Sequence, residues 1–277
     1  MSVTIIAEAG INHNGRLDNA LMLCAAAKAA GADCVKFQLY DPATMVKKDM
    51  APLLAKYRLP DADHVAVKAH CDTLGIEYMA SCFSQERVDF ARSLGVKRIK
   101  VGSGELPNHA LLIHVAATGL PLILSTGMAT MDDIFRAAYA YWDAGGKDLA
   151  LLHCVSNYPT EPRHCNVLGI TTLERNFNVE VRPGVRRVTT IGFSDHCLYD
   201  APAFMAVGLG AKIIEKHFTL DTEMDGPDHH MSLTPEGLRR YVRGIRVAEV
   251  CRGDGDRNHP QPGEEAMRGK ARGRWSS

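Results

Sequence analysis

The 277-residue sequence has none of the usual signals of a protein that binds nucleic acid or inserts into a membrane. Lysine and arginine together number 32, aspartate and glutamate also number 32, and no basic block occurs along the chain. A formal net charge of zero offers no attraction for an anionic polymer or an anionic membrane surface. No apolar run approaches the roughly 20 residues that a transmembrane helix needs.

The N-terminus also lacks the features of a secretory signal. Its first ten residues, MSVTIIAEAG, contain no basic n-region and no long apolar h-region. The eight cysteines include no CxxC pair, and Cys34, Cys82 and Cys154 fall within apolar, strand-like runs, where a reduced cysteine acts as a small hydrophobe. The sequence therefore predicts a cytoplasmic protein that binds neither nucleic acid nor a membrane.

What the sequence does contain is a repeated alternation of two patterns. Short apolar, β-branched runs are separated by longer segments that have the apolar spacing of helices. Eight strand–helix units within about 250 residues favour an α/β fold of the (β/α)8 TIM-barrel type over a doubly wound open sheet. The predicted strands are residues 3–10, 34–38, 77–83, 98–105, 121–127, 149–155, 189–196 and 212–220. The predicted helices are residues 17–32, 62–75, 84–95, 131–146, 201–210 and 234–250.

Nearly every predicted strand ends in a polar side chain. Active sites of barrels of this type lie at the C-terminal ends of the strands, so we expect these side chains to converge. Packing alone does not explain the pattern. The residues concerned are Glu8, Lys36, Gln38, Ser81, Ser84, Lys100, Ser103, Glu105, Ser125, Thr126, His153, Ser156, Tyr158, Ser194, Asp195, His196, Lys216 and His217.

Two histidines end the seventh and eighth predicted strands, which are neighbours in a closed barrel. Adjacent strands lie about 5 Å apart, so His196 and His217 can bind one divalent ion with carboxylate or water completing its coordination. The alternative is that each is a hydrogen-bonded structural residue. His13 and the pair at 229–230 lie in predicted loops, and we do not interpret them as ligands.

Two lysines lie within apolar strands, in the stretches VKF and IKV. Buried lysines are costly unless they are paired, so Lys36 and Lys100 indicate an anion that both face. Serines in or near Gly-containing turns, Ser103, Ser125 and Ser194, can add hydroxyl and backbone N–H donors for a phosphate or carboxylate. The alternative is that each lysine pairs with an internal carboxylate, such as Glu8 or Glu105.

Four carboxylates are candidates for acid–base chemistry, since burial near other charges can bring the pKa of a carboxyl group into the working range. They are Glu8, Asp195, Glu215 and Asp228. Because Glu215 directly precedes Lys216 within the strand, it can instead face outward to a helix.

Seven stretches together resemble the sialic acid synthase family, the phosphoenolpyruvate-dependent synthases of nonulosonic acids. They are IIAEAGINHNG, GADCVKFQ, IKVGSGEL, LILSTGM, LLHCVSNYPT, GFSDH and EKHFTLD…GPDH, in family order along nearly the whole chain. The resemblance implies a (β/α)8 barrel that condenses phosphoenolpyruvate with a sugar or sugar-like aldehyde. The expected products are a 2-keto-3-deoxy acid and phosphate.

The resemblance also implies roles for individual residues. His196 and His217 match the metal-binding histidines, which hold Mn²⁺, or alternatively Mg²⁺ or Co²⁺, to polarise the aldehyde oxygen. Residues that match the phosphoenolpyruvate site are Lys36, Gln38, Lys100, Ser103, Ser125 and Ser194. Residues that match the reaction chamber are Glu8, Glu105, Tyr158 and Asp228, with Glu8 the favoured proton-handling group. Ser156 stands where some members have asparagine near the phosphate.

The C-terminal part departs from the family pattern. Residues 1–252 match the barrel domain, and residues 253–277 match the linker to an antifreeze-like domain that the sequence does not contain. We expect a mobile tail, or alternatively one that folds over the barrel mouth with Trp275 as anchor and Arg268, Arg272 or Arg274 near the acceptor. The resemblance further implies a homodimer. The departure at the C-terminus predicts an acceptor other than N-acetylmannosamine, or alternatively a separate partner chain that carries the missing domain.

Two other classes of function remain open at this point. One is another metal-assisted or Schiff-base aldolase on the same fold, in which Lys36 or Lys100 forms the covalent adduct. The other is a non-catalytic barrel that binds a phosphorylated ligand.

Overall fold

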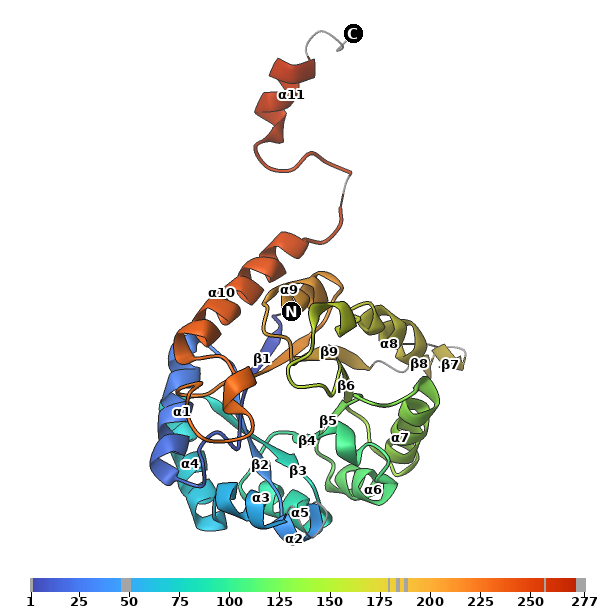
Figure 1. Cartoon of the computed structure of the whole chain (residues 1–277). Coiled ribbons are helices and arrows are strands. Elements are labelled where there is room, and N and C mark those ends of the chain that lie inside the picture. The colour runs from blue at the N-terminus through green and yellow to red at the C-terminus, as the bar shows by residue number, and fades with distance from the viewer. Residues whose placement is uncertain are drawn as a thin grey trace.

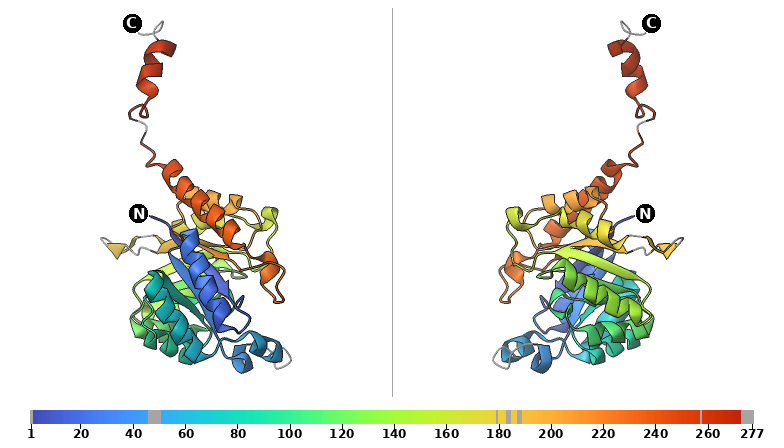
Figure 2. Two further views of the ribbon diagram at one scale, coloured as in Figure 1. Left: turned by 90° about the vertical axis from the view of Figure 1, so that its left-hand side faces the viewer. Right: turned by 90° about the vertical axis from the view of Figure 1, so that its right-hand side faces the viewer.

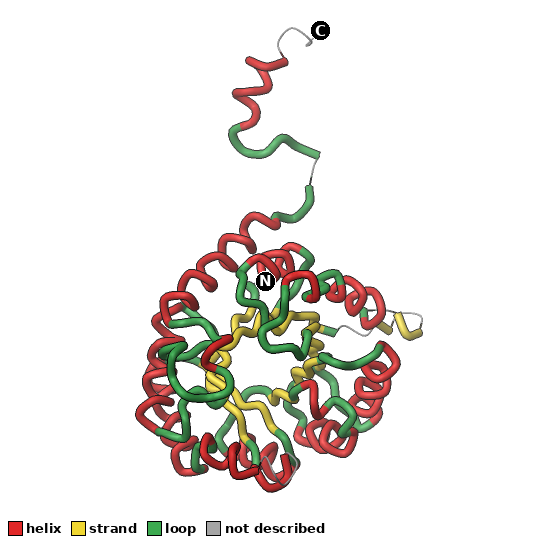
Figure 3. The backbone as a smooth tube through the Cα atoms, viewed as in Figure 1, coloured by secondary structure: helices red, strands yellow, loops and turns green. Residues whose placement is uncertain are grey.

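Eight parallel strands form a closed barrel in the computed structural model, which describes residues 2–45, 51–178, 180–182, 185–186, 189–256 and 258–272. The strands are β1 (Thr4–Gly10), β2 (Cys34–Leu39), β3 (Glu77–Cys82), β4 (Ile99–Val101), β5 (Leu122–Ser125), β6 (Leu149–Cys154), β9 (Thr190–Asp195) and β10 (Ile213–His217). Their order around the barrel is β1-β10-β9-β6-β5-β4-β3-β2. Figure 3 shows the strands as a ring inside the helices. The predicted fold class is confirmed, and each of the eight predicted strands is a barrel strand.

A ring of helices surrounds the barrel (Figure 1). It consists of α1 (Leu17–Ala30), α4 (Asp61–Leu74), α5 (Gln85–Ser93), α6 (His109–Thr118), α7 (Met131–Asp143), α8 (Gly169–Phe177), α9 (Ala201–Gly208) and α10 (Pro235–Arg252). The sequence analysis did not predict α6 or α8. Helix α6 is apolar nearly all round, and α8 contains threonines and asparagine, which are weak helix formers.

Four further short elements lie in the connections between the barrel strands and the helices around them. Two short helices, α2 (Pro42–Met45) and α3 (Ala51–Tyr57), follow β2. A hairpin of β7 (Glu180–Arg182) and β8 (Val185–Arg186) leaves the barrel after α8. None of these was predicted, since short elements carry too little periodicity to identify. Within the described residues, no helix is both long enough and apolar enough to cross a bilayer.

The inward-facing residues of the barrel form two layers. The lower layer is apolar and is a separate cluster of Ile6, Cys34, Met79, Ile123, Ala150, Leu152 and Ile213. Side chains alternate between the two faces of a strand, so residues two positions further along also point inward. Those residues are polar: Glu8 follows Ile6, Lys36 follows Cys34, Ser81 follows Met79 and Glu215 follows Ile213. The apolar floor thus supports a polar layer at the C-terminal ends of the strands.

Outward-facing residues of the same strands join a second, larger core against the helices. Ile5, Val35 and Tyr78 belong to this cluster, together with Leu23 of α1 and Val67 of α4.

Helix α7 begins with a capping box, which fixes where the helix starts. The side chains of Thr130 and Asp133 each accept a hydrogen bond from the backbone N–H of the other residue.

The C-terminal tail projects away from the barrel (Figures 1 and 2). It ends in a helix, α11 (Glu264–Arg272), which was not predicted. Every residue whose exposure is described between Cys251 and Arg272 is exposed, so this part of the tail does not fold over the barrel mouth. The proposed anchor Trp275 and the candidate acceptor contact Arg274 lie outside the described residues.

Candidate active site

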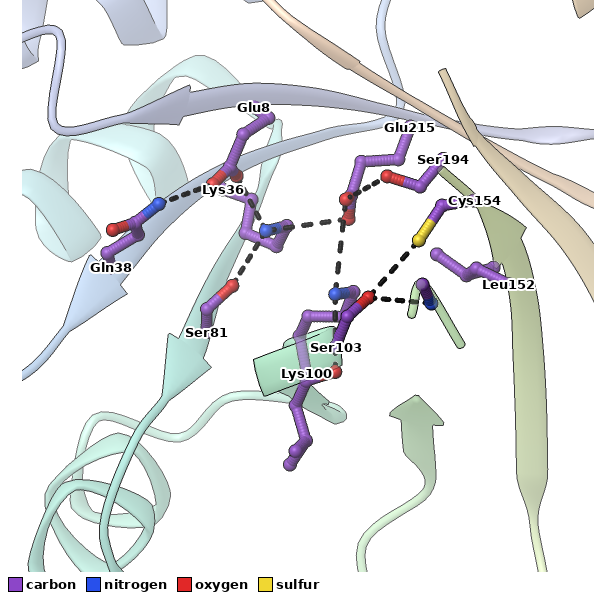
Figure 4. Close-up of polar contacts among 12 residues, drawn as sticks. Glu8, Lys36, Gln38, Ser81, Lys100, Ser103, Leu152, Cys154, Ser194 and Glu215 are labelled. Carbon is purple, nitrogen blue, oxygen red and sulfur yellow. Dashed lines mark hydrogen bonds and ion pairs between the residues drawn. The ribbon is translucent and has the colours of Figure 1, made fainter. Parts of the chain in front are cut away.

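The polar side chains predicted from strand ends surround one cavity of about 380 Å³ at the C-terminal end of the barrel. Figure 4 shows how side chains from several strands point toward one another there. Predicted residues in its wall are Glu8, Lys36, Gln38, Ser81, Lys100, Ser103, Ser125, Ser156, Tyr158, Ser194, His196, Glu215 and His217. Phe83, Gly102, Gly104, Met128 and Cys154 also line the cavity.

Lys36 is the centre of a buried charged network. Its Nζ lies 2.7 Å from Oε2 of Glu8, 3.4 Å from Oε2 of Glu215 and 2.7 Å from the hydroxyl of Ser81. The lysine and both carboxylates are less than 5% exposed. Lys100 is held less tightly, with its Nζ 3.9 Å from Oε1 of Glu215 and 3.3 Å from its neighbour's carbonyl oxygen. The two lysines therefore do pair with internal carboxylates, but the shared partner is Glu215 and not Glu105.

The ionisation states of this network follow from burial and from the lysines. Burial raises the pKa of Glu8 to about 7, although Lys36 acts in the opposite direction. Burial also opposes ionisation of Glu215, but Lys100 and Lys36 outweigh it and lower the pKa of Glu215 to about 2. Burial lowers the pKa of Lys100, partly offset by Glu215. When Glu8 is protonated, the network contains two ammonium groups, Lys36 and Lys100, and one ionised carboxylate, Glu215. Its net charge is then positive, which favours binding of an anion.

The interpretation of Glu215 as an outward-facing residue was wrong. Glu215 points into the barrel and accepts a hydrogen bond of 2.8 Å from the Ser194 hydroxyl (Figure 4). The alternation of side chains along a strand could have predicted this orientation. Glu215 lies two residues before His217, so both side chains lie on the same face of β10. By the same rule Asp195 lies on the outer face, and it contacts Lys216 and the Tyr241 hydroxyl instead of the cavity.

The two predicted metal ligands lie side by side at the cavity wall. The ring centroids of His196 and His217 are 5.7 Å apart, and the ring of Tyr158 lies 4.2 Å from the first and 6.1 Å from the second. Burial lowers the pKa of both histidines, so both imidazoles are neutral near pH 7. Neutral imidazole is the form that binds a metal.

The hydrogen bonding of these histidines fits such a role. His196 donates its Nδ1–H to the carbonyl oxygen of Val155 at 2.7 Å, because a carbonyl can only accept. Nε2 then keeps its lone pair and lies 3.4 Å from the Ser194 hydroxyl, whose proton goes to Glu215. In metal-binding histidines, too, the other ring nitrogen is held by a second partner. The buried Nδ1 of His217 has no hydrogen-bond partner. In the described part of the chain, no group of three His, Cys, Asp or Glu side chains is placed to hold an ion.

Seven predicted residues lie outside the wall of this cavity: Ser84, Glu105, Thr126, His153, Asp195, Lys216 and Asp228. Asp228 lies beside the cavity, with Oδ2 3.8 Å from Nδ1 of His217, and burial raises its pKa to about 6. Glu105 is a correction to the prediction: it ends a 3₁₀ turn, Ser103–Glu105, that directs its carboxylate to Asn108 at 2.8 Å. It lines a neighbouring cavity, which shares only Phe83 as a wall with the central one.

Serines and a glycine form the part of the wall contributed by β4, β5 and β6. The Ser103 hydroxyl accepts the Gly127 N–H at 2.9 Å and lies 3.2 Å from Sγ of Cys154. The buried hydroxyl of Ser125 has no hydrogen-bond partner, which leaves a donor for a ligand. A Cβ atom on Gly127 would lie 2.3 Å from the hydroxyl of Ser156, so only glycine fits this wall.

A cavity of about 430 Å³ lies at the opposite end of the barrel. Its wall consists largely of the residues that begin strands, such as Thr4, Leu122 and Leu149. The N-terminal face of such barrels contributes stability, whereas chemistry occurs at the C-terminal face. The cavity around Lys36 is therefore the candidate active site.

A TIM barrel with lysines, carboxylates and neutral histidines converging at the C-terminal ends of its strands has the architecture of an enzyme. Comparison with known proteins identifies which kind. The sequence matches the NeuB family over residues 23–257, and the chain belongs to that family.

Curated relatives carry the names of synthases. The chain is 39% identical over 292 residues to N,N'-diacetyllegionaminic acid synthase of Legionella pneumophila, covering 98% of this chain and 79% of the relative. It is 37% identical over 259 residues to N-acetylneuraminate-9-phosphate synthase of Drosophila melanogaster, covering 88% and 67% of the two chains. These names, with the family match, show that the protein is an enzyme.

A solved structure agrees in fold. The N-acetylneuraminic acid (sialic acid) synthetase of Leptospira borgpetersenii, determined in complex with citrate, superposes with a TM-score of 0.88 at 30% sequence identity. The match covers 99% of this chain and 92% of that one. The resemblance to the sialic acid synthase family is therefore confirmed.

Proposed function

We propose that the protein condenses phosphoenolpyruvate with an aldose, or a similar aldehyde, in a reaction that depends on a divalent metal. The observation that carries the proposal is the convergence of Lys36 and Lys100 with the neutral pair His196 and His217 in one cavity. Phosphoenolpyruvate carries a phosphate and a carboxylate, so it suits a cavity with two buried ammonium groups. Relatives named as synthases of N,N'-diacetyllegionaminic acid, pseudaminic acid and N-acetylneuraminate 9-phosphate support this assignment.

The balanced reaction consumes one water. A bond forms between C3 of phosphoenolpyruvate and the aldehyde carbon, water adds at C2, and the C2–O bond to phosphate breaks. The products are a 2-keto-3-deoxy acid and inorganic phosphate. His196 and His217 would hold the metal, preferably Mn²⁺, which supplies Lewis-acid polarisation of the aldehyde when bound.

The remaining residues bind the substrates and handle the proton. Lys100, Ser103 and Ser125 would bind the anionic groups. Two observations support this: Lys100 is less closely paired than Lys36, and the buried Ser125 hydroxyl has no hydrogen-bond partner. Glu8, whose pKa of about 7 lets it be protonated or ionised at working pH, would supply the proton that the aldehyde oxygen takes up. Asp228 and Gln38 approach Glu8 around Gly10, where a Cβ atom would lie 3.5 Å from each of the three side chains.

The test is phosphate release from phosphoenolpyruvate with Mn²⁺ and a panel of aldehydes that includes N-acetylmannosamine and non-acetylated sugars. We expect release that requires an acceptor, that EDTA abolishes, and that the His217→Ala variant lacks. Release that is unaffected by EDTA and by His217→Ala would contradict the metal-dependent mechanism. The panel also tests the prediction that the acceptor is not N-acetylmannosamine. The homodimer, the separate partner chain and the cytoplasmic location stay predictions.

One observation favours a second candidate, a Schiff-base aldolase. Burial lowers the pKa of Lys100, and a lysine of lowered pKa can act as a nucleophile. Borohydride reduction in the presence of pyruvate would then attach three carbons to Lys100, which mass spectrometry detects. The metal-dependent synthase predicts no such adduct.

A further inference from the structure

The outer faces of β9 and β10 carry a buried polar cluster that the proposed chemistry does not use. Asp195 and Lys216 pair in register on these neighbouring strands, and each is 1% exposed. Nζ of Lys216 lies 3.1 Å from Oδ2 of Asp195, and the hydroxyl of Tyr241 in α10 donates to the same oxygen at 2.8 Å. The Lys216 ammonium also lies 5.5 Å from the centre of the Tyr241 ring. The cluster joins two strands to the helix behind them.

Asp195 and Lys216 also form hydrogen bonds to the backbone of Cys197, the residue that follows His196. Oδ1 of Asp195 accepts the Cys197 N–H at 2.9 Å, and the ammonium of Lys216 donates to the Cys197 carbonyl oxygen. Strand β9 ends at Asp195, so His196 lies beyond the last residue that pairs with β10. Bonds from the Thr160 N–H and to the Val155 carbonyl tie His196 to the loop after β6, and not to β10.

The cluster therefore lies directly behind both histidines, because Asp195 precedes His196 and Lys216 precedes His217. We propose that Asp195, Lys216 and Tyr241 are positioning residues that set the separation of the His196 and His217 rings. The proposal rests on the proposed function in that these histidines hold the divalent ion. Metal–ligand distances tolerate only about 0.2 Å of error, so a small movement of the His196 backbone is enough to weaken binding.

The competing explanation is that the cluster only stabilises the barrel. Buried ion pairs are poor sources of stability, since the loss of hydration offsets most of the attraction between the charges. Replacing both charged residues by apolar ones is often neutral, whereas removing one leaves an unpaired buried charge. The double variant Asp195→Leu with Lys216→Met therefore separates positioning from stability. The milder variant Tyr241→Phe removes only one hydroxyl.

The Tyr241→Phe variant has a matched control in Tyr78→Phe. The Tyr78 hydroxyl on β3 lies 3.0 Å from Nδ1 of His64 in α4, so it is also a buried contact between a barrel strand and a helix, but away from the histidine pair. Binding of Mn²⁺ is measured by electron paramagnetic resonance, and the melting temperature by calorimetry. We expect the double variant to bind Mn²⁺ at least tenfold more weakly than wild type, and Tyr241→Phe several-fold more weakly. The melting temperature of Tyr78→Phe should fall by about as much as that of Tyr241→Phe, but its Mn²⁺ affinity should equal that of wild type.

A second measurement does not depend on metal. Crystal structures of the metal-free wild type and double variant give the separation of the His196 and His217 ring centroids, which is 5.7 Å here. The proposal expects this separation to change by about 0.5 Å or more in the variant. An unchanged separation in a folded double variant would overturn it, whatever the metal result. If wild type fails to bind Mn²⁺, the metal dependence of the proposed function is wrong, and the ring separation still decides the positioning role.

Discussion

Nζ of Lys36 lies 2.7 Å from Oε2 of Glu8 inside the barrel, and each residue is only 2% exposed. This contact joins β1 to β2 at the level where the cavity opens. Because both groups are out of water, the protonation of Glu8 affects the stability of the protein as well as its chemistry. The pH dependence of stability that follows from Glu8 can be measured by calorimetry without a substrate.

Glu8 should make the protein less stable as the pH rises. Its pKa is raised from 4.5 to about 7 by burial, so between these values the folded state binds the proton more strongly than the unfolded state. The stabilisation is complete below pH 4.5 and is lost as pH rises through 7, by about 3 kcal/mol in total. The difference in free energy of unfolding between wild type and Glu8→Gln, followed in EDTA across this range, isolates the effect. A difference that does not vary with pH would contradict it.

Lys100→Met should weaken phosphoenolpyruvate binding with little loss of stability. Glu215 keeps Lys36 at 3.4 Å and the Ser194 hydroxyl at 2.8 Å when Lys100 is replaced. Titration calorimetry should show at least a tenfold loss of phosphoenolpyruvate affinity, or about 1.4 kcal/mol. Lys36→Met is the comparison: it removes the close partner of Glu8, and its melting temperature should fall further. Wild-type affinity in Lys100→Met would exclude this lysine from the anion site.

Gly192→Ala should destabilise the barrel through a clash in its interior. A Cβ atom there would lie 2.5 Å from Cδ2 of Leu152 and 2.6 Å from the carbonyl oxygen of Ile213. Overpacking of this kind costs about 1–3 kcal/mol, which urea denaturation can measure. Gly208→Ala is the control, since nothing lies within 4 Å of its added Cβ atom. Equal stability of the two variants would show that the interior adjusts.

Deleting residues 253–277 should leave the barrel unchanged. The described residues of this segment are exposed, and they project away from the barrel (Figure 2). The melting temperature and phosphoenolpyruvate affinity of the truncated protein should match those of the full chain within error. Loss of acceptor affinity after truncation would instead support a tail that folds over the cavity during turnover.

Much of the site was predictable because a parallel barrel converts sequence position into spatial position. Polar residues that end strands, such as Lys36, Lys100 and His217, had to meet at one end of the barrel once the fold was recognised. Glu105 shows the limit of the rule: it follows β4, but a 3₁₀ turn directs it to a neighbouring cavity. Turns after strands have no fixed period, so sequence pattern does not give their direction.

The sequence by itself determined the alternation of strands and helices and the set of polar side chains at the strand ends. Only the tertiary structure decided which charges pair. Lys36 and Lys100 share Glu215 inside the barrel, and Lys216 pairs with Asp195 on the outer face of β10 and β9. The physical reason is that pairing depends on distances of 3–4 Å between residues far apart in the chain. Those distances are set by how the whole barrel closes.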